Sequence, residues 1–282
     1  MHEPVQPLHS DVSETPATPR GRAIVITSGK GGVGKTTTTA NIGHALARRG
    51  VRVALVDADI GLRNLDLVLG LEQRVRFHVL DVLEEKVELE DALIADKYSP
   101  TLYLLAAAQA REKDEVDEVK MKALIDRLRE LFDYVIIDSP AGIEQGFKNA
   151  VIGAQEAIVV CTPEVSAVRD VDRVVGLLGN AFRPQLIVNR LRPQLVKKGK
   201  MLSVEDVNAI LRLPLLGVIA DEPEIIVSTN KGMPIALQDE GATSAAYRAI
   251  AARLAGEDIP APTVEMKDSF MDRLGSFFGG RR

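Results

Sequence analysis

The chain has 282 residues, of which 46% are apolar, and a formal net charge of −5. This length and composition allow a sizeable buried core, and the acidic balance argues against a protein held to nucleic acid by its overall field. The single cysteine excludes an internal disulfide framework and a four-thiolate metal cluster within one chain. That residue, Cys161, lies in the apolar run AIVVC, so we expect a buried strand residue in a protein of the reducing cytosol.

The first 20 residues contain four prolines and few apolar side chains. This composition predicts a flexible tail over residues 1–20, and it lacks the apolar centre of a signal peptide. No apolar stretch approaches the roughly 20 residues that are needed to span a bilayer.

After the tail, β-branched apolar runs alternate with helical patterns. The runs are AIVITS, VRVALVD, LYLLAA, DYVIID, AIVVCT, QLIVN and LLGVIA, which begin at Ala23, Val51, Leu102, Asp133, Ala157, Gln185 and Leu215. They are continuous rather than alternating, as is typical of strands covered on both faces. Helices are predicted over residues 36–49, 116–132, 166–178, 204–211 and 243–254. The alternation predicts an α/β fold with a mostly parallel central sheet and helices on both faces.

The stretch GKGGVGKT, from Gly29 to Thr36, fits the pattern G-x-x-x-x-G-K-[ST] of a phosphate-binding loop. It follows a predicted strand and precedes a predicted helix, which is the context that such a loop requires. Backbone N–H groups and the helix N-terminus would hold the phosphates of a nucleotide. Lys35 would pair with the outer phosphates, and the Thr36 hydroxyl would ligate Mg²⁺. A fold of the P-loop NTPase type is therefore predicted.

Acidic residues close two of the apolar runs. Asp57 and Asp59 end the second run, and Asp138 ends DYVIID. Ligands in open α/β sheets bind beyond the carboxyl ends of the strands, so all three carboxylates are expected to face the phosphates. Asp138 is the candidate Mg²⁺ ligand, and Asp59 or Asp57 is the candidate to orient the attacking water. The alternative is that they cap turns or helices.

The loop contains a second lysine, Lys30. One nucleotide site has limited room for two cations beside the triphosphate. In a two-fold dimer, Lys30 could reach the nucleotide of the partner subunit, as an arginine finger does in trans. The alternative is a solvated surface lysine.

The last segment forms an apolar stripe when it is placed on a helix. We expect a globular part over residues 21–256, a linker over 257–265 and an amphipathic membrane-targeting helix over 266–282. The side chains expected to contact lipid are Phe270, Met271, Leu274, Phe277 and Phe278, flanked by the basic Lys267 and Arg273. One such anchor binds weakly, whereas two on a dimer would bind together. The alternative is a terminal helix that packs on its own core.

Five stretches closely resemble the MinD family of division-site-placing ATPases over about residues 23–254. They are KGGVGKTTTTANIG, DADIGLRNLDLVLGLE, IIDSPAGIEQGF, AIVVCTPEVSAVRDVDRVVGLL and LIVNRLRP, and the ending FFGGRR is also similar to that family. The family has a deviant P-loop with an additional signature lysine, which Lys30 matches. The resemblance implies that ATP with Mg²⁺ drives a sandwich dimer in which this lysine reaches the partner's nucleotide.

The resemblance also assigns roles to individual residues. It implies that Asp59 positions the hydrolytic water with Asp57 beside it, and that Asp138 lies on the Mg²⁺ side. Asn189 matches an asparagine that reads adenine, with Arg190 adjacent. The remaining residues expected at the nucleotide are Gly29, Lys30, Gly31, Gly32, Val33, Gly34, Lys35, Thr36, Thr37 and, at the dimer interface, Asn64. DEPEIIVSTNKGMP resembles the loop and helix that close the base pocket, but its proline follows the acidic pair, so the contacts of residues 221–224 with the base are left open.

The function implied by the resemblance is a cytoplasmic ATPase that dimerises on ATP and binds the inner face of the cell membrane. It would recruit a MinC-like division inhibitor to place the septum, and hydrolysis, stimulated by a MinE-like activator, would release it. Anionic lipids are the expected surface, and no specific nucleic acid is expected.

There are four alternatives to this function. A flagellar-number-controlling ATPase is the first alternative, but the chain lacks that group's DQAxxLR-type motif. A DNA-partitioning ATPase of the ParA kind is the second, although its loop after the second strand usually runs to Pro-Gln, which is absent here. A nitrogenase-reductase-like role has too few cysteines, and a scaffold that does not hydrolyse its nucleotide would make the three aspartates incidental.

Overall fold

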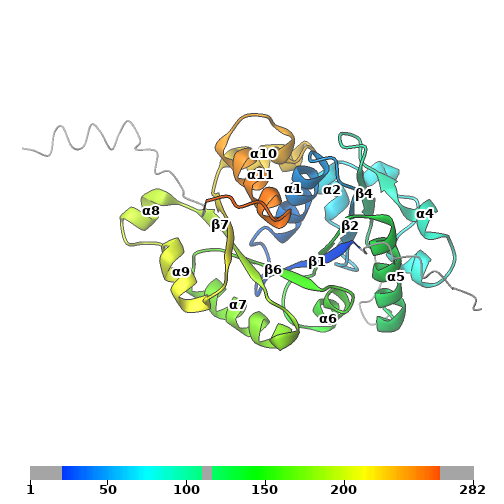
Figure 1. Cartoon of the computed structure of the whole chain (residues 1–282), viewed down its shortest axis with the longest axis horizontal. Coiled ribbons are helices and arrows are strands. Elements are labelled where there is room, and N and C mark those ends of the chain that lie inside the picture. The colour runs from blue at the N-terminus through cyan, green and yellow to red at the C-terminus, as the bar shows by residue number, and fades with distance from the viewer. Residues whose placement is uncertain (1–20, 110–115, 261–282) are drawn as a thin grey trace, which may run out of the picture.

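The computed structural model describes residues 21–109 and 116–260. Within them, strands form an eight-stranded sheet in the order β3-β4-β2-β5-β1-β6-β7-β8, with β3 antiparallel to β4 and the other neighbouring pairs parallel (Figure 1). The strands are β1 Arg22–Thr27, β2 Val53–Asp57, β3 Ile94–Ala95, β4 Leu102–Leu105, β5 Tyr134–Asp138, β6 Glu156–Cys161, β7 Gln185–Leu191 and β8 Leu215–Ala220.

Helices cover both faces of the sheet, as Figure 1 shows. In β1, Ile24 and Ile26 join the apolar cluster on one face, whereas Ala23 and Val25 join the cluster on the other face. The first face is covered by α1 Lys35–Ala47, α2 Leu65–Leu69, α10 Pro223–Asn230, the short 3-10 helix η4 Ile235–Leu237 and α11 Ala242–Leu254. The second face is covered by α3 Val79–Leu83, α4 Leu89–Ala92, α5 Glu118–Leu131, α6 Gln145–Val151, α7 Val165–Leu178 and α9 Val204–Leu211.

The predicted α/β architecture is confirmed, since each predicted strand and helix corresponds to one in the structure within a few residues. β3 and several short helices were not predicted from the sequence, namely α2, α3, α4, α6 and α8 Pro193–Lys197, together with the 3-10 segments η1 Glu72–Arg74, η3 Gly179–Ala181 and η4. α10 lies in the segment where the resemblance implies a loop and a helix. Cys161 is fully buried in β6, as predicted, and burial raises the pKa of its thiol to about 12.

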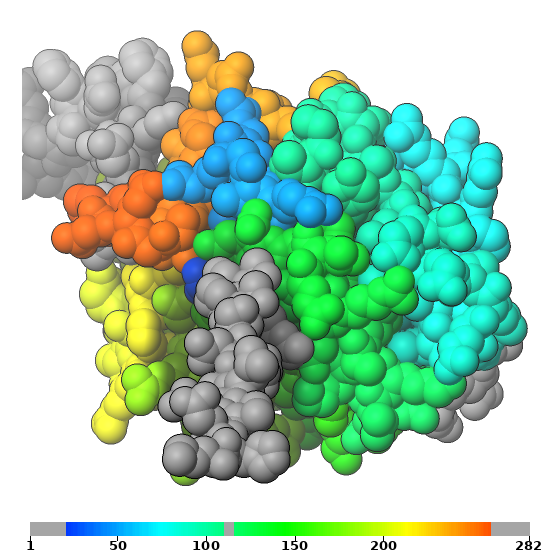
Figure 2. Space-filling model, turned by 45° about the vertical axis from the view of Figure 1, so that its right-hand side comes forward, coloured from blue at the N-terminus to red at the C-terminus, as the bar shows by residue number. Residues whose placement is uncertain are grey.

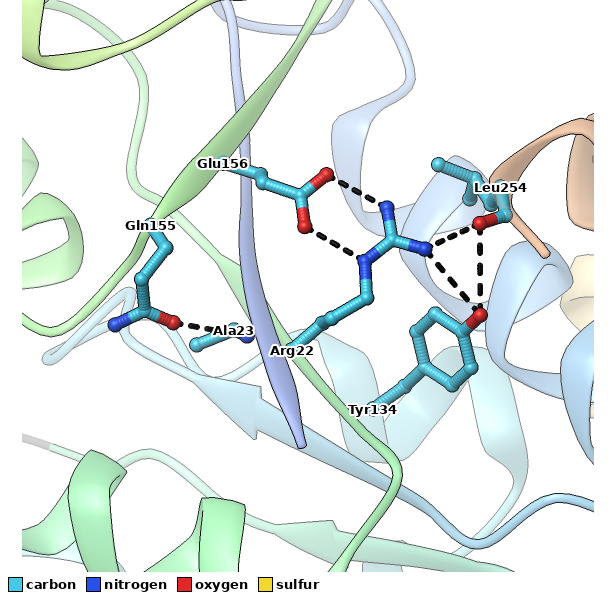
Figure 3. Close-up of polar contacts among 6 residues, drawn as sticks. All are labelled: Arg22, Ala23, Tyr134, Gln155, Glu156 and Leu254. Carbon is cyan, nitrogen blue, oxygen red and sulfur yellow. Dashed lines mark hydrogen bonds and ion pairs between the residues drawn. The ribbon is translucent and has the colours of Figure 1, made fainter. Parts of the chain in front are cut away.

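A cluster of polar contacts fixes the end of α11 at the edge of the sheet where the parallel strands begin (Figure 3). The Arg22 guanidinium donates from Nε and Nη2 to the two carboxylate oxygens of Glu156, at 2.7 and 2.6 Å. Its Nη1 donates to the carbonyl of Leu254 and, at 3.4 Å, to the hydroxyl of Tyr134. These bonds join β1, β5, β6 and the last residue of α11.

The residues that follow α11 lie against the end of α1. Glu257 forms an ion pair with Arg49, and in Figure 2 the orange C-terminal part of the described chain lies beside the light-blue region near the end of α1. Within residues 21–109 and 116–260, no helix is long and apolar enough to cross a membrane. The predicted tail over residues 1–20 and the predicted helix over residues 266–282 lie outside the described residues, as does most of the predicted linker.

Candidate functional site

The phosphate-binding loop connects the end of β1 to the start of α1, as the sequence predicts. Gly32 and Gly34 adopt left-handed backbone conformations with φ of +75° and +97°, which glycine tolerates far better than other residues. Gly34 is the N-cap of α1, and its carbonyl accepts the N–H of Thr38 at 2.9 Å. The loop therefore ends at a helix N-terminus, where backbone N–H groups and the helix dipole attract phosphate.

Two loop glycines are also required by close contacts. A Cβ on Gly29 would lie 2.3 Å from the backbone carbonyl carbon of Asp170 in α7. A Cβ on Gly34 would lie 2.4 Å from Nδ2 of Asn189 at the end of β7. The loop is thus packed between elements that are far apart in the sequence.

Lys35, Thr36 and Asp138 come together beneath the loop. Asp138 is 1% exposed, and Thr39, one turn into α1, donates its hydroxyl to Asp138 Oδ1 at 3.2 Å. Burial raises the pKa of Asp138 to about 6, while a hydrogen bond from Thr36, the charge of Lys35 and the Thr39 bond oppose that rise. A cation close to a buried carboxylate stabilises its charged form, which burial alone disfavours.

These groups fit a magnesium–nucleotide complex. Mg²⁺ usually keeps several waters and takes one or two protein oxygens plus substrate phosphates, rather than a full cage of protein ligands. Residues 21–109 and 116–260 contain no cluster of three or more histidine, cysteine or acidic side chains able to hold a metal alone. The hydroxyl of Thr36 and the carboxylate of Asp138 are the oxygens that would hold the ion.

Asp57 orders the loop that follows β2. Its Oδ1 accepts the backbone N–H of Asp59 at 3.0 Å, and its Oδ2 accepts those of Asn64 and Leu65 at 3.2 and 3.1 Å. Burial, followed by the negative charge of Asp138, raises the pKa of Asp57 to about 7. The contacts of Asp57 are thus those of a residue that caps a turn, which is the alternative given for it from the sequence. The expected position of Asp57 beside the hydrolytic water remains a prediction.

Asp59 lies on that ordered loop, half-buried at the carboxyl end of β2. Its charge contributes to raising the pKa values of both Asp57 and Asp138, so it faces the same acidic corner of the site. Asn64 is exposed at the N-cap of α2. Both residues lie at the edge of the sheet that carries the phosphate loop.

Lys30 projects from the rim of the loop. Its side chain is 50% exposed, and its Nζ lies 3.9 Å from Oε2 of Glu164, a residue that is itself half-exposed. The backbone at Lys30 is held by Ser28, whose hydroxyl donates to the Lys30 carbonyl at 2.8 Å. Lys30 therefore differs from Lys35, which is 8% exposed at the base of the loop.

Asn189 and Arg190 lie near the end of β7, and the first is buried whereas the second is exposed. Asn189 is 5% exposed, and its Nδ2 donates to the carbonyl of Val33 in the phosphate loop at 2.7 Å. Arg190 is exposed and has a φ of 57°. Next to them, the backbone N–H of Asp221 donates to the carbonyl of Leu191 at 2.9 Å, which ties the predicted base-pocket segment to the same strand end.

Some residues that shape the site were missed by the sequence analysis. Thr39 and Ser28 are fully buried hydroxyls that bond to Asp138 and to the loop backbone. For Thr39 a signal was present, because it lies four residues after Lys35 in the TTTT run and therefore on the same face of the helix. The predicted lipid-contacting residues lie in the segment that the structure does not describe.

Comparisons with known proteins agree with this geometry. Residues 24–235 match the family model of the CobQ/CobB/MinD/ParA nucleotide binding domain. The chain is 55% identical over 242 residues to the septum site-determining protein MinD of Synechocystis sp., which covers 85% of this chain and 91% of that protein.

Solved structures give the same result. The chain is similar to a chain of the MinC:MinD cell division protein complex of Aquifex aeolicus, with a TM-score of 0.80, 48% identity and coverage of 85% of this chain and 98% of that chain. It is also similar to the septum site-determining protein MinD of Pyrococcus horikoshii complexed with Mg-ADP, with a TM-score of 0.76, 33% identity and coverage of 85% and 100%. The family match spans the phosphate loop, both acidic strand ends and Asn189.

Proposed function

Because the chain belongs to the MinD family of septum site-determining ATPases, we propose that it is a membrane switch whose state is set by ATP. As a member of that family it is a nucleotide-binding ATPase with a role in septum placement. The proposal adds that ATP drives a homodimer, that the dimer binds the cytoplasmic face of the membrane, and that it recruits a division inhibitor. Hydrolysis then separates the subunits and releases them.

One observation carries the dimer proposal: the two loop lysines occupy different environments. Lys35 is buried at the base of the loop, where it would pair with the phosphates of its own nucleotide. Lys30 is half-exposed at the rim, and its intrachain partner Glu164 is at 3.9 Å and also exposed, a pair worth at most about 1 kcal/mol. A partner's triphosphate, with several negative charges, would attract Lys30 more strongly than Glu164 does.

Apolar side chains at the same edge of the sheet support a protein partner there. Leu62, Ile143 and Val165 are 61%, 43% and 61% exposed. They follow β2, β5 and β6 respectively, so all three lie where the parallel strands end and where the phosphate loop lies. Large exposed apolar residues gathered at one edge are a feature of protein–protein interfaces.

The chemistry proposed for this site is the transfer of a phosphoryl group to water. When bound, Mg²⁺ neutralises charge on the phosphates. Lys35 and the loop N–H groups hold the phosphates, and Asp59 orients the attacking water. The water oxygen bonds to the γ-phosphorus while the bond from that phosphorus to the bridging oxygen of ADP breaks, and the proton of the water passes to the solvent. Asp57 keeps the loop of Asp59 in place through its three N–H bonds.

The partner proposal follows from the relatives. The Aquifex aeolicus neighbour is a complex of MinD with MinC, so we assign a MinC-like division inhibitor to this chain, and a MinE-like protein as the activator of hydrolysis. For the membrane, the proposal assigns the amphipathic segment at residues 266–282, whose predicted contacts are with anionic lipid. Single anchors of this kind bind reversibly, and two on one dimer gain roughly 10²–10⁴-fold in avidity.

Liposome co-sedimentation tests the switch. The full chain and a chain that ends at Val264 are mixed with phosphatidylglycerol vesicles in ATP, a slowly hydrolysed ATP analogue, or ADP. We expect only the full chain with ATP or the analogue to sediment, and the shortened chain to retain nucleotide binding. Phosphatidylcholine vesicles are the control for charge.

Two results would contradict the proposal. Sedimentation that is independent of nucleotide would separate the anchor from the ATP state. Equal binding by the shortened chain would remove the terminal segment from the mechanism. ATP-dependent retention on duplex DNA in place of vesicles would favour a partitioning function.

A further inference from the structure

Asn189 lies at an irregular point of the sheet. The pairing of β7 with β6 ends at Val188, and the pairing of β7 with β8 shifts register between Val188 and Leu191. Within this bulge, Arg190 takes the left-handed φ of 57°, which is uncommon for a residue with a side chain. The consequence is that Asn189 is buried while Arg190 is exposed.

The buried amide makes a direct bond to the phosphate loop. Asn189 Nδ2 donates to the carbonyl of Val33 at 2.7 Å, across 156 positions of the sequence. A backbone carbonyl can only accept, so the NH₂ group of the amide must face the loop. The same nitrogen lies against Gly34, where an added Cβ would come within 2.4 Å of it.

The bonded carbonyl lies at a critical place in the loop. Phosphate binding requires the loop N–H groups to converge on the ligand, so the carbonyls between them must face away. The peptide that joins Val33 to Gly34 is next to a glycine with a φ of +97°, a residue that imposes little conformational restraint of its own. An external bond to the Val33 carbonyl holds this peptide in the orientation that presents the following N–H groups.

We propose that Asn189 is a positioning residue of the phosphate-binding loop, in addition to any contact that it makes with the base. The amide has two N–H donors and one carbonyl acceptor, and the bond to Val33 uses one of the three. The other two are the groups through which a base would be read. A single side chain thus links the base end of the site to its phosphate end. This proposal rests on the proposed nucleotide-binding function.

The test uses a ligand that has no base. Affinities for Mg²⁺–tripolyphosphate and for Mg²⁺–ATP are measured by calorimetry on the full chain and on the variants Asn189→Ala and Asn189→Leu. The leucine variant is of similar size and uncharged but cannot donate to Val33. Gln185→Ala, at the opposite end of β7, is the matched control. Amide hydrogen exchange over residues 31–36 in the nucleotide-free protein is a second readout that needs no ligand.

We expect both Asn189 variants to bind tripolyphosphate about tenfold more weakly, as the loss of one buried hydrogen bond with an orphaned carbonyl predicts. Exchange over residues 31–36 should accelerate in the same variants, and Gln185→Ala should change neither quantity. Thermal melting identifies any variant that has lost its fold, and the other Asn189 variant then carries the test.

The proposal is overturned if both variants lose affinity for ATP but bind tripolyphosphate as the wild type does, with unchanged exchange, because Asn189 would then act on the base alone. Unchanged exchange also overturns it if tripolyphosphate binds too weakly to measure. A wild-type chain that binds neither ATP nor tripolyphosphate would instead contradict the proposed function itself.

Discussion

Two buried carboxylates lie next to each other at the ends of adjacent strands, and they have different hydrogen-bond partners. Asp57 and Asp138 are register partners of β2 and β5, and each is 1% exposed. Asp57 uses its oxygens to accept three backbone N–H groups, so it is committed to the structure of its own loop. Asp138 accepts hydroxyl bonds from the first turns of α1, on the side of the phosphate loop. Asp138 is thus the one of these two carboxylates that contacts the helix following the phosphate loop.

The raised pKa of Asp138 predicts a pH dependence of stability in the nucleotide-free protein. Because burial raises its pKa to about 6 from 3.8, the folded state binds more protons than the unfolded state between these values. The free energy of unfolding therefore falls as the pH rises through this window. We expect Asp138→Asn to remove this loss and to be more stable than the wild type at pH 8, by on the order of 1–3 kcal/mol.

Urea unfolding at pH 4.5 and pH 8 measures the effect. The advantage of the asparagine variant should be present at pH 8 and largely absent at pH 4.5. Asp91→Asn, an exposed position on α4, is the control and should show neither difference. Mg²⁺–ADP should stabilise the wild type but not Asp138→Asn. A variant that is less stable than the wild type at pH 8 would contradict this account of Asp138.

At the scale of elements, the phosphate loop is fixed by its neighbours as much as by its own glycines. Gly29 packs on α7 and Gly34 on the end of β7, so helices and strands on both sides determine the path of the loop. Its central residue Val33 is 4% exposed and belongs to the core under α1. The loop is consequently a packed part of the fold, and changes in its backbone affect α7, β7 and α1 together.

Gly34→Ala tests this packing. The new Cβ would lie 2.4 Å from Asn189 Nδ2, at a residue whose φ of +97° already disfavours a side chain. We expect destabilisation of about 1–3 kcal/mol and a loss of ATP binding of at least tenfold, measured by thermal melting and calorimetry.

The matched control is Gly199→Ala, where φ is +61° and a Cβ would meet nothing within 4 Å. It should lose roughly 1 kcal/mol of stability and no affinity for ATP. Equal losses of ATP affinity in the two variants would contradict this account, because Gly199 lies outside the phosphate loop.

The elements also indicate what a sequence can predict here. Continuous apolar runs of four residues identified β1, β2 and β5, and in the structure the carboxyl ends of β2 and β5 bring Asp57 beside Asp138. The two-residue β3 and the five-residue α2 were missed because such short elements show no hydrophobic period. The bond from Asn189 to Val33 depends on a bulge and on residues 156 positions apart, so no local pattern could have predicted it.

At the scale of the whole molecule, the predicted nucleotide-binding residues and the end of α11 lie at opposite edges of the sheet. The phosphate loop, Asp59 and Lys30 lie where the parallel strands end. The last residue of α11 is bound to Arg22, at the start of β1, so α11 ends at the opposite edge of the sheet (Figure 3). A partner that covers the nucleotide edge would leave the end of α11 uncovered, which is compatible with the proposed use of two membrane segments by a dimer.

In the proposed cycle, Lys30 acts in dimer formation and Asp59 acts in hydrolysis. Substitution of Lys30 should therefore prevent dimers from forming, whereas substitution of Asp59 should prevent them from separating. In Lys30→Ala the charge proposed to act across the dimer is lost, whereas the buried Lys35 remains. We expect ATP binding within about threefold of the wild type, no ATP-dependent dimer by light scattering, and no ATP-dependent sedimentation with phosphatidylglycerol vesicles.

In Asp59→Ala the dimer contacts remain but the water is no longer oriented. We expect ATP turnover to fall by about 10²-fold or more, while ATP-dependent dimers accumulate and stay bound to vesicles after the wild type has been released. Lys198→Ala, an exposed lysine after α8, controls for loss of surface charge and should behave as the wild type does. ATP-dependent dimers of Lys30→Ala would contradict the proposed cycle. Release of Asp59→Ala from the vesicles as fast as the wild type would also contradict it. In either case, dimerisation would not be the step that couples hydrolysis to membrane release.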